Sequence, residues 1–370
     1  MKKSILLLTM LLMIVSCAKK SAPMPVYIWA SDNGDPSEET LRENFRLWQE
    51  HHVTGVCYNV GWDTTRIKQV SAIAHEYGME YHAWIPTMLD GDQDPSWYTV
   101  NRLGESSLDH PAYVPYYKTL DPHNPEVVEY LVNRYAEVAA IPTVDYVQLD
   151  YIRYADVILS RGLWDKYGLD MGEEYPAADY CYCDDCVEDF KSRTGIDIRA
   201  VDDPSKCPEW AEFRCNVVTA LVNQIAAVVH AQGKKISADV FPGPDSYARW
   251  MVRQQWNDWA VDAFFPMNYN DFYLEPASWV GDITWEEVES VAERGVPVYS
   301  GLFICRDWQH KDQIEDPEGH GLLPSELEEA VTGAMEAGAQ HLHVWQPCGW
   351  LRVLPAHGAA SWWYPAEQGG

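Results

Sequence analysis

The stretch that decides the fold is Val144-Asp145-Tyr146-Val147-Gln148-Leu149-Asp150-Tyr151-Ile152-Arg153-Tyr154. Its centre alternates apolar and polar side chains with a period of two, which predicts a β-strand over Tyr146–Asp150. Gln148 and Asp150 then share one face of the strand, and Val147 and Leu149 share the other. Functional side chains of α/β proteins lie at the carboxyl ends of parallel strands, so Asp150 is a candidate site residue.

Similar short apolar runs recur on both sides of this strand, separated by segments with helical periodicity. The expected strands are Val26–Trp29, Val53–Tyr58, Glu80–Trp84, Tyr146–Asp150, Ile236–Phe241, Ala263–Met267, Val296–Gly301 and His341–Trp345. The expected helices lie near Glu38–Glu50, Ile67–Tyr77, Pro125–Ala139, Trp210–Ala231, Tyr247–Trp259, Trp285–Arg294 and Pro324–Ala337. This alternation predicts the α/β class and a single closed (β/α)8 TIM barrel, with a doubly wound open sheet as the alternative.

Two connections in this pattern are long. Residues 86–124 follow the third strand, and residues 151–209 follow the fourth. Long loops at the carboxyl ends of strands belong to the functional face of a barrel. The chain has 370 residues, whereas a bare barrel takes roughly 250, so we expect these two loops to shape the site.

The composition excludes one class of function and favours another. Lys and Arg number 27 against 56 Asp and Glu, and the formal net charge is −29. Such a surface repels phosphate backbones, so nucleic-acid binding is excluded. The chain has 17 Trp and 22 Tyr but 8 Phe. Flat rings with a polar edge suit a sugar-binding cleft, although many such rings also pack in cores.

The N-terminus has the features of a bacterial export signal. Lys2 and Lys3 precede an apolar run from Ile5 to Val15, which is too short to span a bilayer as an ordinary helix. The run ends at Ile14-Val15-Ser16-Cys17, which resembles a lipobox and implies cleavage before Cys17 and a lipid on its sulfur. An ordinary signal peptide is the alternative.

These features give an expected organisation of the whole chain. Residues 1–17 would be the lipoprotein signal with its lipobox cysteine, 18–25 a tether, 26–358 the barrel and 359–370 a C-terminal tail. We expect an exported protein, anchored through the lipid on Cys17 to a membrane of a bacterial cell envelope and facing the periplasm or the cell surface.

A second strand also ends on an inward carboxylate. In Ile236-Ser237-Ala238-Asp239-Val240 the polar Ser237 and Asp239 share a face. Two carboxylates about 5 to 10 Å apart at adjacent strand ends are the machinery of glycoside hydrolysis. One attacks or stabilises the developing oxocarbenium carbon, and the other, with a raised pKa, protonates the leaving oxygen. The structural alternative is that either Asp caps a helix or pairs with Arg153.

Other acidic residues compete with this pair. A loop Asp is more often a cap or turn former than a catalyst. The residues concerned are Asp121, Asp156, Asp245, Asp271 and Asp307.

Residues 144–154 resemble the fourth strand of the family 10 glycosyl-hydrolase-like TIM-barrel proteins and their relatives. Further similar segments are Leu120–Val127, His82–Trp84, Ser237–Phe241 and Pro266–Tyr269. The resemblance covers roughly residues 26–350 and implies a retaining carbohydrate hydrolase with Asp150 as nucleophile. Leu149 stands where many members carry a second Asp, and this departure leaves open the exact branch of the family and any branch-specific substrate.

We therefore predict a glycoside hydrolase of a poly- or oligosaccharide that needs no cofactor for catalysis. Asp150 would be the nucleophile and Asp239 the general acid/base. The expected substrate-binding residues are Trp29, His82, Trp84, Arg153, Tyr269 and Trp345. The rival is a non-catalytic, lipid-anchored carbohydrate-binding barrel. A metal-dependent deacetylase would need a third ligand beside His341 and His343, and the sequence indicates none.

The loop after the fourth strand contains Cys181-Tyr182-Cys183-Asp184-Asp185-Cys186. Three thiolates at this spacing can bind Zn²⁺ if a fourth ligand such as Cys207, Cys215 or Cys57 completes the tetrahedron. The spacing resembles the zinc knot of some barrel β-galactosidases, which implies a structural role. An exported protein meets an oxidising compartment, so disulfides such as Cys186 with Cys207 are the alternative.

Overall fold

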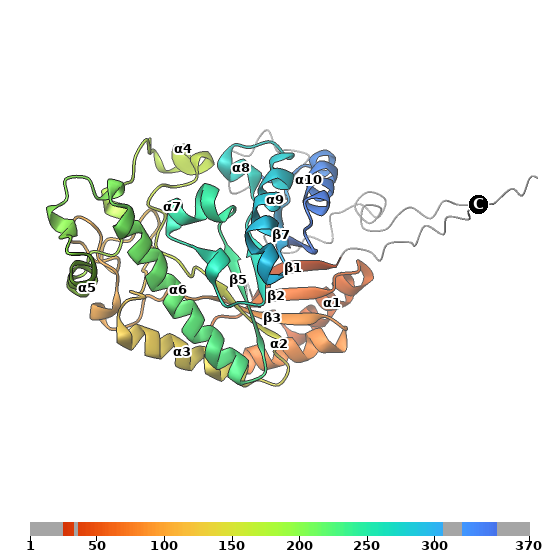
Figure 1. The fold of residues 1–370 in the computed structure, drawn as a ribbon. Helices are drawn as coiled ribbons and strands as arrows, with labels where there is room; N and C mark the ends of the chain where they lie inside the picture. Colours follow the sequence, from red (N-terminus) through yellow and green to blue (C-terminus); the bar gives the residue numbers. More distant parts are fainter. Residues whose placement is uncertain (1–24, 33–35, 306–319, 346–370) are drawn as a thin grey trace, which may run out of the picture.

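The computed structural model describes residues 25–32, 36–305 and 320–345, which form one (β/α)8 barrel (Figure 1). The parallel strands are β1 (Val26–Ser31), β2 (Gly55–Asn59), β3 (Glu80–Pro86), β4 (Tyr146–Asp150), β5 (Lys235–Val240), β6 (Ala263–Pro266), β7 (Tyr299–Phe303) and β8 (His341–Trp345). Their order is β6-β5-β4-β3-β2-β1-β8-β7. Isolated parallel bridges, Phe264 with Val298 and Met267 with Gly301, join β6 to β7. The predicted fold class is confirmed, and the open-sheet alternative is wrong.

Helices cover the outside of the barrel (Figure 1). The long ones are α1 (Glu38–Glu50), α2 (Thr64–Glu76), α3 (Pro125–Ala139), α6 (Pro208–Ala231), α9 (Trp279–Val291) and α10 (Pro324–Glu336). The side chains of Ser37, Asp63 and Asn124 accept hydrogen bonds from the first turns of α1, α2 and α3. Such caps satisfy amide groups that have no partner inside the helix. The starts of α1 and α3 agree with the prediction, whereas α2 begins three residues before the expected Ile67.

The helix predicted at Tyr247–Trp259 is wrong. The chain there forms a π-helical turn (Pro244–Ala248), a short α7 (Arg249–Val252) and a 3-10 turn (Trp256–Asp258). Arg253, at φ 58°, ends α7 in the left-handed region. The Gln254 side chain accepts from Phe241 N–H, and Trp256 Nε1 donates to Phe241 O. These side chains satisfy the loop backbone after β5, which a straight helix would leave unpaired.

The barrel interior is filled with aromatic side chains. Tyr27 (β1), Tyr146 (β4), Phe265 (β6) and Tyr299 (β7) lie in one buried cluster inside the strands. Phe265 and Tyr299 stack with their ring centroids 4.3 Å apart. This packing fills the barrel toward the amino ends of the strands, so a functional site can form only at their carboxyl ends.

The two long loops bind to each other as well as to the barrel. Asn101 and Tyr180 form an antiparallel bridge. Tyr182 N donates to Val100 O at 2.7 Å, and Arg102 N donates to Asp179 O at 2.9 Å. The loop after β4 also contains α4 (Trp164–Tyr167) and α5 (Asp184–Thr194), and a short α8 (Asn270–Tyr273) follows β6. The loops after β3 and β4 therefore form one layer above the barrel.

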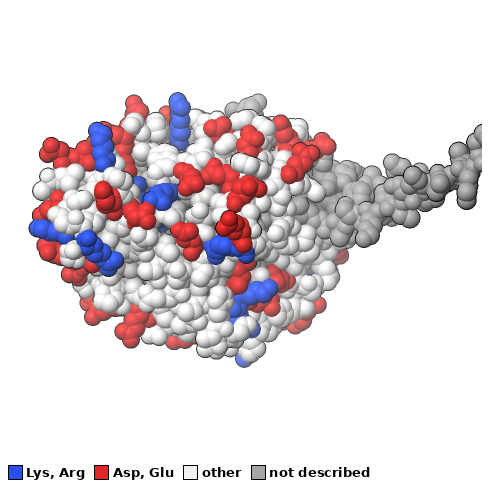
Figure 2. Space-filling view, in the orientation of Figure 1, with Lys and Arg blue, Asp and Glu red and all other residues white. Residues whose placement is uncertain are grey.

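Acidic side chains dominate the face shown in Figure 2, where Lys and Arg are scattered among them. This agrees with the net charge of −29. Among the residues that the structure describes, no helix is long and apolar enough to cross a membrane. Cys17 and the C-terminal tail 359–370 lie outside the described residues.

Candidate active site

Asp150 and Asp239 lie side by side at the carboxyl ends of β4 and β5. Leu149 pairs with Ala238 in the parallel register, so the two carboxylates occupy the next position on neighbouring strands. Neighbouring strands lie about 4.8 Å apart. Both residues line one cavity of about 310 Å³, and they are 7% and 1% exposed. The structure thus brings the two predicted catalytic residues together.

Asp150 is held by two donors. Its Oδ2 accepts from Trp84 Nε1 at 2.9 Å, and its Oδ1 accepts from the backbone N–H of Tyr151 at 2.7 Å. Burial raises the pKa of Asp150, and these two hydrogen bonds, with the charge of Arg153, oppose that rise. The donors stabilise the ionised form that a nucleophile needs.

Asp239 has a different environment on the neighbouring strand. Its Oδ1 accepts from Gln148 Nε2 at 2.7 Å, and its Oδ2 accepts from Trp29 Nε1 at 3.4 Å. Burial, and then the nearby charge of Asp150, raise the pKa of Asp239 well above its ordinary value. Both carboxyl groups thus have raised pKa values, and for Asp239 the charge of its neighbour adds to the effect of burial.

Aromatic side chains form the walls above the carboxylates. Trp29, Trp84 and Tyr269 all line the cavity, as predicted from their places at strand ends. The ring centroid of Trp29 lies 6.5 Å from that of Trp84 and 6.3 Å from that of Tyr269. Trp345 ends β8, but its side chain lies outside the described residues.

Arg153, a predicted substrate-binding residue, lines the cavity too and pairs there with Asp156. Its Nη1 donates to Asp156 Oδ2 at 2.7 Å, and its Nη2 donates to Tyr117 Oη at 3.2 Å. The guanidinium carbon lies 5.1 Å from the ring centroid of Tyr151. The structural alternative, a pair between Arg153 and a strand-end Asp, is therefore wrong; Arg153 pairs with Asp156 and presents a cation on the cavity wall.

The expected substrate contact of His82 is wrong. His82 is the third residue of β3 and pairs in register with Tyr146, the first residue of β4, so it lies well below the strand end. Its ring is fully buried and stacks on Tyr146 with centroids 4.1 Å apart. Its nitrogens bond to Ser237 Oγ at 3.0 Å and to Glu80 Oε1 at 3.1 Å. His82 thus packs inside the barrel.

His341 also lies at the amino end, because it is the first residue of β8. Its ring centroid lies 4.1 Å from that of Tyr299. Burial lowers the pKa of His341 to about 4. This histidine is remote from the strand ends that carry Asp150, so it adds nothing to a deacetylase centre there. The side chain of His343 lies outside the described residues.

The loop after β3 contributes aromatic side chains to the cavity that were not predicted. Tyr113, Tyr116 and Tyr117 of that loop line the cavity, together with Tyr151 and Phe272 from other segments. The Tyr-rich run from Tyr113 to Tyr117 was an available signal. Its place above the barrel depends on how two loops pack together, and no local pattern encodes that.

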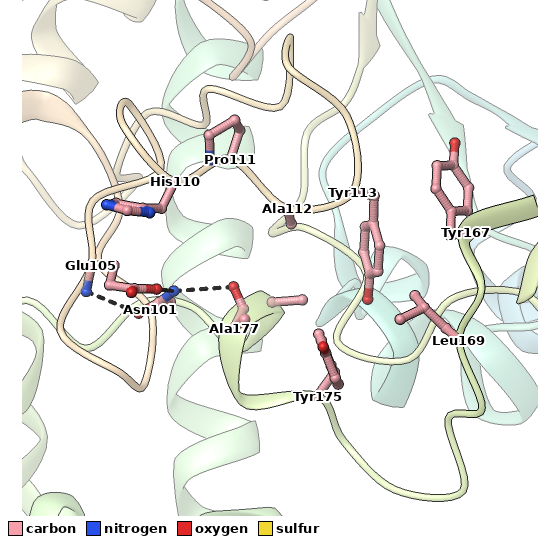
Figure 3. Close-up of a pocket in the computed structure, with 11 residues that line it drawn as sticks. Asn101, Glu105, His110, Pro111, Ala112, Tyr113, Tyr167, Leu169, Tyr175 and Ala177 are labelled. Carbon is pink, nitrogen blue, oxygen red and sulfur yellow. Dashed lines mark hydrogen bonds between the residues drawn. The ribbon is translucent and has the colours of Figure 1, made fainter.

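A second cavity of about 330 Å³ adjoins the first (Figure 3). The two cavities share Tyr113 and Tyr167, whose ring centroids are 5.9 Å apart. Asn101 Nδ2 donates to Glu105 and to Ala177 O, each at 3.1 Å, and so ties the two loops together beside this cavity (Figure 3). The hollow region above the barrel therefore extends beyond the carboxylate pair.

The cysteine cluster has a composition that differs from the prediction. Cys181, Cys183 and Cys186 lie with Asp121, and the four ligand atoms are all within 4.8 Å of one another. The sulfur of Cys207 lies 3.5 Å from Glu209 Oε2 instead, so Cys207 is wrong as the fourth ligand.

The alternative to a metal site, disulfide bonds of the cluster cysteines, is not found in the described part of the chain. Cys181, Cys183, Cys186 and Cys207 are free thiols, so the suggested bond between Cys186 and Cys207 is not formed. The other suggested ligands, Cys57 and Cys215, are buried outside this cluster.

Fold and site together define an α/β barrel with a carboxylate pair at its functional end. No protein-family model matches the chain, so the resemblance to the family 10-like group stays a prediction. No curated protein matches it in sequence.

Several solved structures share the fold. The glycoside hydrolase domain of PgaB (BpsB) from Bordetella bronchiseptica matches with a TM-score of 0.63 at 12% identity, covering 88% of this chain and 94% of that one. The catalytic domain of β-amylase from Paenibacillus polymyxa matches with 0.54 at 10% identity, covering 88% and 93%. The endo-1,4-β-D-mannanase from Thermotoga petrophila RKU-1 matches with 0.51 at 9% identity, covering 87% and 88%. At these identities the similarity establishes the barrel fold.

Proposed function

We propose that this protein hydrolyses O-glycosidic bonds of a poly- or oligosaccharide. The observation that carries the proposal is the pair Asp150 and Asp239, two buried carboxyl groups on adjacent strand ends that line one aromatic cavity. The barrels with similar folds named above are themselves glycoside-cleaving enzymes by name, which supports the same class of reaction.

The chemistry follows from the two environments. Asp150, ionised and held by Trp84 and the Tyr151 amide, attacks the anomeric carbon while the bond to the leaving oxygen breaks. Asp239 gives its proton to that oxygen. In the second step Asp239 takes a proton from water, which attacks the anomeric carbon and releases Asp150. The positions of Asp150 and Asp239 on adjacent strands, whose backbones lie about 4.8 Å apart, support a retaining mechanism, because an inverting enzyme needs room for a water molecule between its two carboxyl groups.

The walls and the second cavity support an oligomeric substrate. The rings of Trp29, Trp84 and Tyr269 can stack on apolar faces of sugar rings, and their polar edges can bond to hydroxyl groups. The cavity that shares Tyr113 and Tyr167 would accept a further sugar unit.

The test is hydrolysis of a panel of polysaccharides and oligosaccharides by the chain that starts at Ala18. Asp150→Asn should abolish cleavage of the substrate found, and Asp239→Asn should lower kcat by about 10²- to 10⁴-fold. The Asp239→Asn variant should cleave aryl glycosides with good leaving groups far better than natural links, because such leaving groups need no proton. Asp245→Asn, an exposed carboxylate after β5, is the matched control and should act like the parent.

Two outcomes would overturn this assignment. Normal hydrolysis by a folded Asp150→Asn variant would remove Asp150 from the mechanism. Hydrolysis by none of the proteins, together with tight retention of one glycan, would favour the carbohydrate-binding barrel instead. Inversion of the anomeric centre in an NMR time course would refute the retaining mechanism alone.

We also propose that the mature protein begins at Cys17 and is anchored by lipid in a bacterial envelope membrane. The lipobox-like Ile14-Val15-Ser16-Cys17 supports this proposal. The full chain should incorporate radiolabelled fatty acid and enter the detergent phase of a Triton X-114 extract, and Cys17→Ser should do neither. Equal labelling of the two proteins would contradict it.

A further inference from the structure

We propose that Asp121, Cys181, Cys183 and Cys186 bind one structural Zn²⁺ ion that joins the loops after β3 and β4. Asp121 comes from the end of the first loop, just before α3, and the cysteines come from the second loop and the start of α5. The ion would therefore link two segments that lie about 60 residues apart in sequence.

The four ligand atoms are close enough together to bind one ion, since all lie within 4.8 Å of one another. Asp121 Oδ2 lies 3.3 Å from Cys181 Sγ, 3.0 Å from Cys183 Sγ and 3.9 Å from Cys186 Sγ. Zinc with Zn–S bonds of about 2.3 Å and Zn–O bonds of about 2.0 Å separates its ligands by roughly 3.5 to 3.8 Å. Small shifts of the side chains would bring all four into this range.

Backbone amide groups already point at the sulfurs. Val100 N–H donates to Cys181 Sγ at 3.3 Å, and Cys183 N–H donates to the same sulfur at 3.4 Å. Cys186 N–H donates to Cys183 Sγ at 3.4 Å. Amide groups that donate to thiolates spread their negative charge and orient them toward a metal. The other oxygen of Asp121, Oδ1, accepts from His123 N–H at 2.9 Å, which leaves Oδ2 facing the sulfurs.

The donor set selects the metal. Asp121, Cys181 and Cys186 are 3%, 0% and 1% exposed, so a carboxylate here is cut off from water and faces sulfur on several sides. A divalent cation compensates that burial, and three thiolates with one carboxylate suit Zn²⁺ far better than Mg²⁺ or Ca²⁺. A disulfide between two of the cysteines would leave Asp121 with one thiol and no cation.

The position of the cluster assigns it a structural role. None of the four residues lines the cavity above Asp150. Asp121 lies in the same loop as Tyr113, Tyr116 and Tyr117, which line that cavity, and follows Tyr117 by four residues. The ion would thus hold the loop with Tyr113, Tyr116 and Tyr117 in place without contacting the substrate.

The experiment measures metal rather than activity, so its result does not depend on the proposed hydrolysis. The chain from Ala18 is purified under reducing conditions without added metal. Inductively coupled plasma mass spectrometry should then find one zinc ion per chain. Substitution with Co²⁺ should give the intense visible bands of a tetrahedral thiolate site. Cys183→Ser should lose the metal, and Asp121→Asn should weaken its retention against a competing chelator by at least about tenfold.

Cys207→Ser is the matched control, because Cys207 is a nearby buried thiol outside the cluster. It should keep one zinc per chain. If the ligand variants do not fold, chelation of the parent should still release one zinc and lower its melting temperature. The proposal would be overturned if the purified parent contained no metal, or if two of the three cysteines formed a disulfide. Equal zinc loss from Cys207→Ser and Cys183→Ser would also overturn the ligand set.

Discussion

The indole N–H groups of Trp84 and Trp29 act on opposite members of the carboxylate pair. Trp84 donates to Asp150 and Trp29 donates to Asp239, and each bond lowers the pKa of its own acceptor. The proposed mechanism needs Asp150 ionised and Asp239 protonated, so activity against pH should be bell-shaped. Because both pKa values are raised, both limbs should lie above the range of ordinary carboxyl groups.

Removing each donor should therefore move one limb. Trp84→Phe should raise the pKa of Asp150 further and shift the acidic limb to higher pH. Trp29→Phe should do the same to Asp239 and shift the alkaline limb to higher pH. The measurement is kcat/KM against pH for the parent and both variants. If Trp84→Phe moved the alkaline limb instead, the roles of the two carboxylates would be the reverse of those proposed.

The buried carboxyl of Glu287 on α9 should make the free energy of unfolding depend on pH, independently of catalysis. Its carboxyl accepts from Asn268 Nδ2 at 3.0 Å and from Gly243 N–H at 3.2 Å. Burial raises the pKa of Glu287 from 4.5 to about 8. Between these two values the folded chain holds a proton that the unfolded chain releases, so the free energy of unfolding should fall as pH rises through this window.

Glu287→Gln should remove that loss, which amounts to at most about 1.4 kcal/mol per pH unit for one group. Urea unfolding at several pH values between 5 and 8 provides the measurement. The control is Glu289→Gln, an exposed side chain on the same helix, which should leave the slope of the parent intact. A slope equally steep in Glu287→Gln would show that another group causes it.

Single residues also mark the limit of what the sequence could show. Alternation along β4 and β5 was enough to find Asp150 and Asp239, because the face of a strand follows from parity. It could not separate a residue in the middle of a strand from one at its end, which is why His82 was misplaced. It could not find Asp121 as a neighbour of the cysteines, because that contact joins two loops whose packing is not local.

At the scale of elements, predictability follows the strength of local signals. The bounds of α1, α3, β4 and β8 agree with the sequence analysis, since caps, prolines and alternation mark them. The segment after β5 failed because tertiary contacts of Gln254 and Trp256 outweigh its helical periodicity. The loop helix α5 was missed, although Cys183 caps its start.

Helices α9 and α10 pack closely at Gly281 and Gly333, and this contact leads to a prediction about stability. A Cβ on Gly281 would lie 2.9 Å from Gly333 Cα, so these two helices touch backbone to backbone. Gly281→Ala should force them apart and lower the free energy of unfolding by about 1 to 3 kcal/mol, despite a gain in helix propensity of about 1 kcal/mol. Thermal and chemical unfolding test this.

A matched control exists in the loop after β4. A Cβ on Gly172 would meet no described atom within 4 Å, and its backbone is compatible with alanine. Gly172→Ala should therefore unfold like the parent. An unchanged or raised stability of Gly281→Ala would mean that the helices can separate at little cost.

At the scale of the whole molecule, we expect charge to influence which glycans bind. The net charge is −29, acidic side chains dominate the face in Figure 2, and the cavity wall carries Asp150, Asp156 and Asp239 against Arg153. Neutral glycans should therefore be preferred over polymers of uronic acids or sulfated sugars. Kd values of matched neutral and carboxylated oligosaccharides for Asp150→Asn would measure this preference. Tighter binding of the carboxylated oligosaccharide would show that the positive charge of Arg153 has a larger effect than the surrounding carboxylates.

The barrel closes between β6 and β7 through isolated bridges rather than a continuous ladder. Gly301 lies at this junction, where a Cβ would come within 2.4 Å of Pro266 O. Because few hydrogen bonds join β6 to β7, we expect local opening of the barrel to begin at this junction. In deuterium exchange, amides of β7 should therefore label sooner than those of β3 and β4, and the fluctuation would separate β6 from β7 while the β4–β5 ladder that carries the carboxylate pair stays paired.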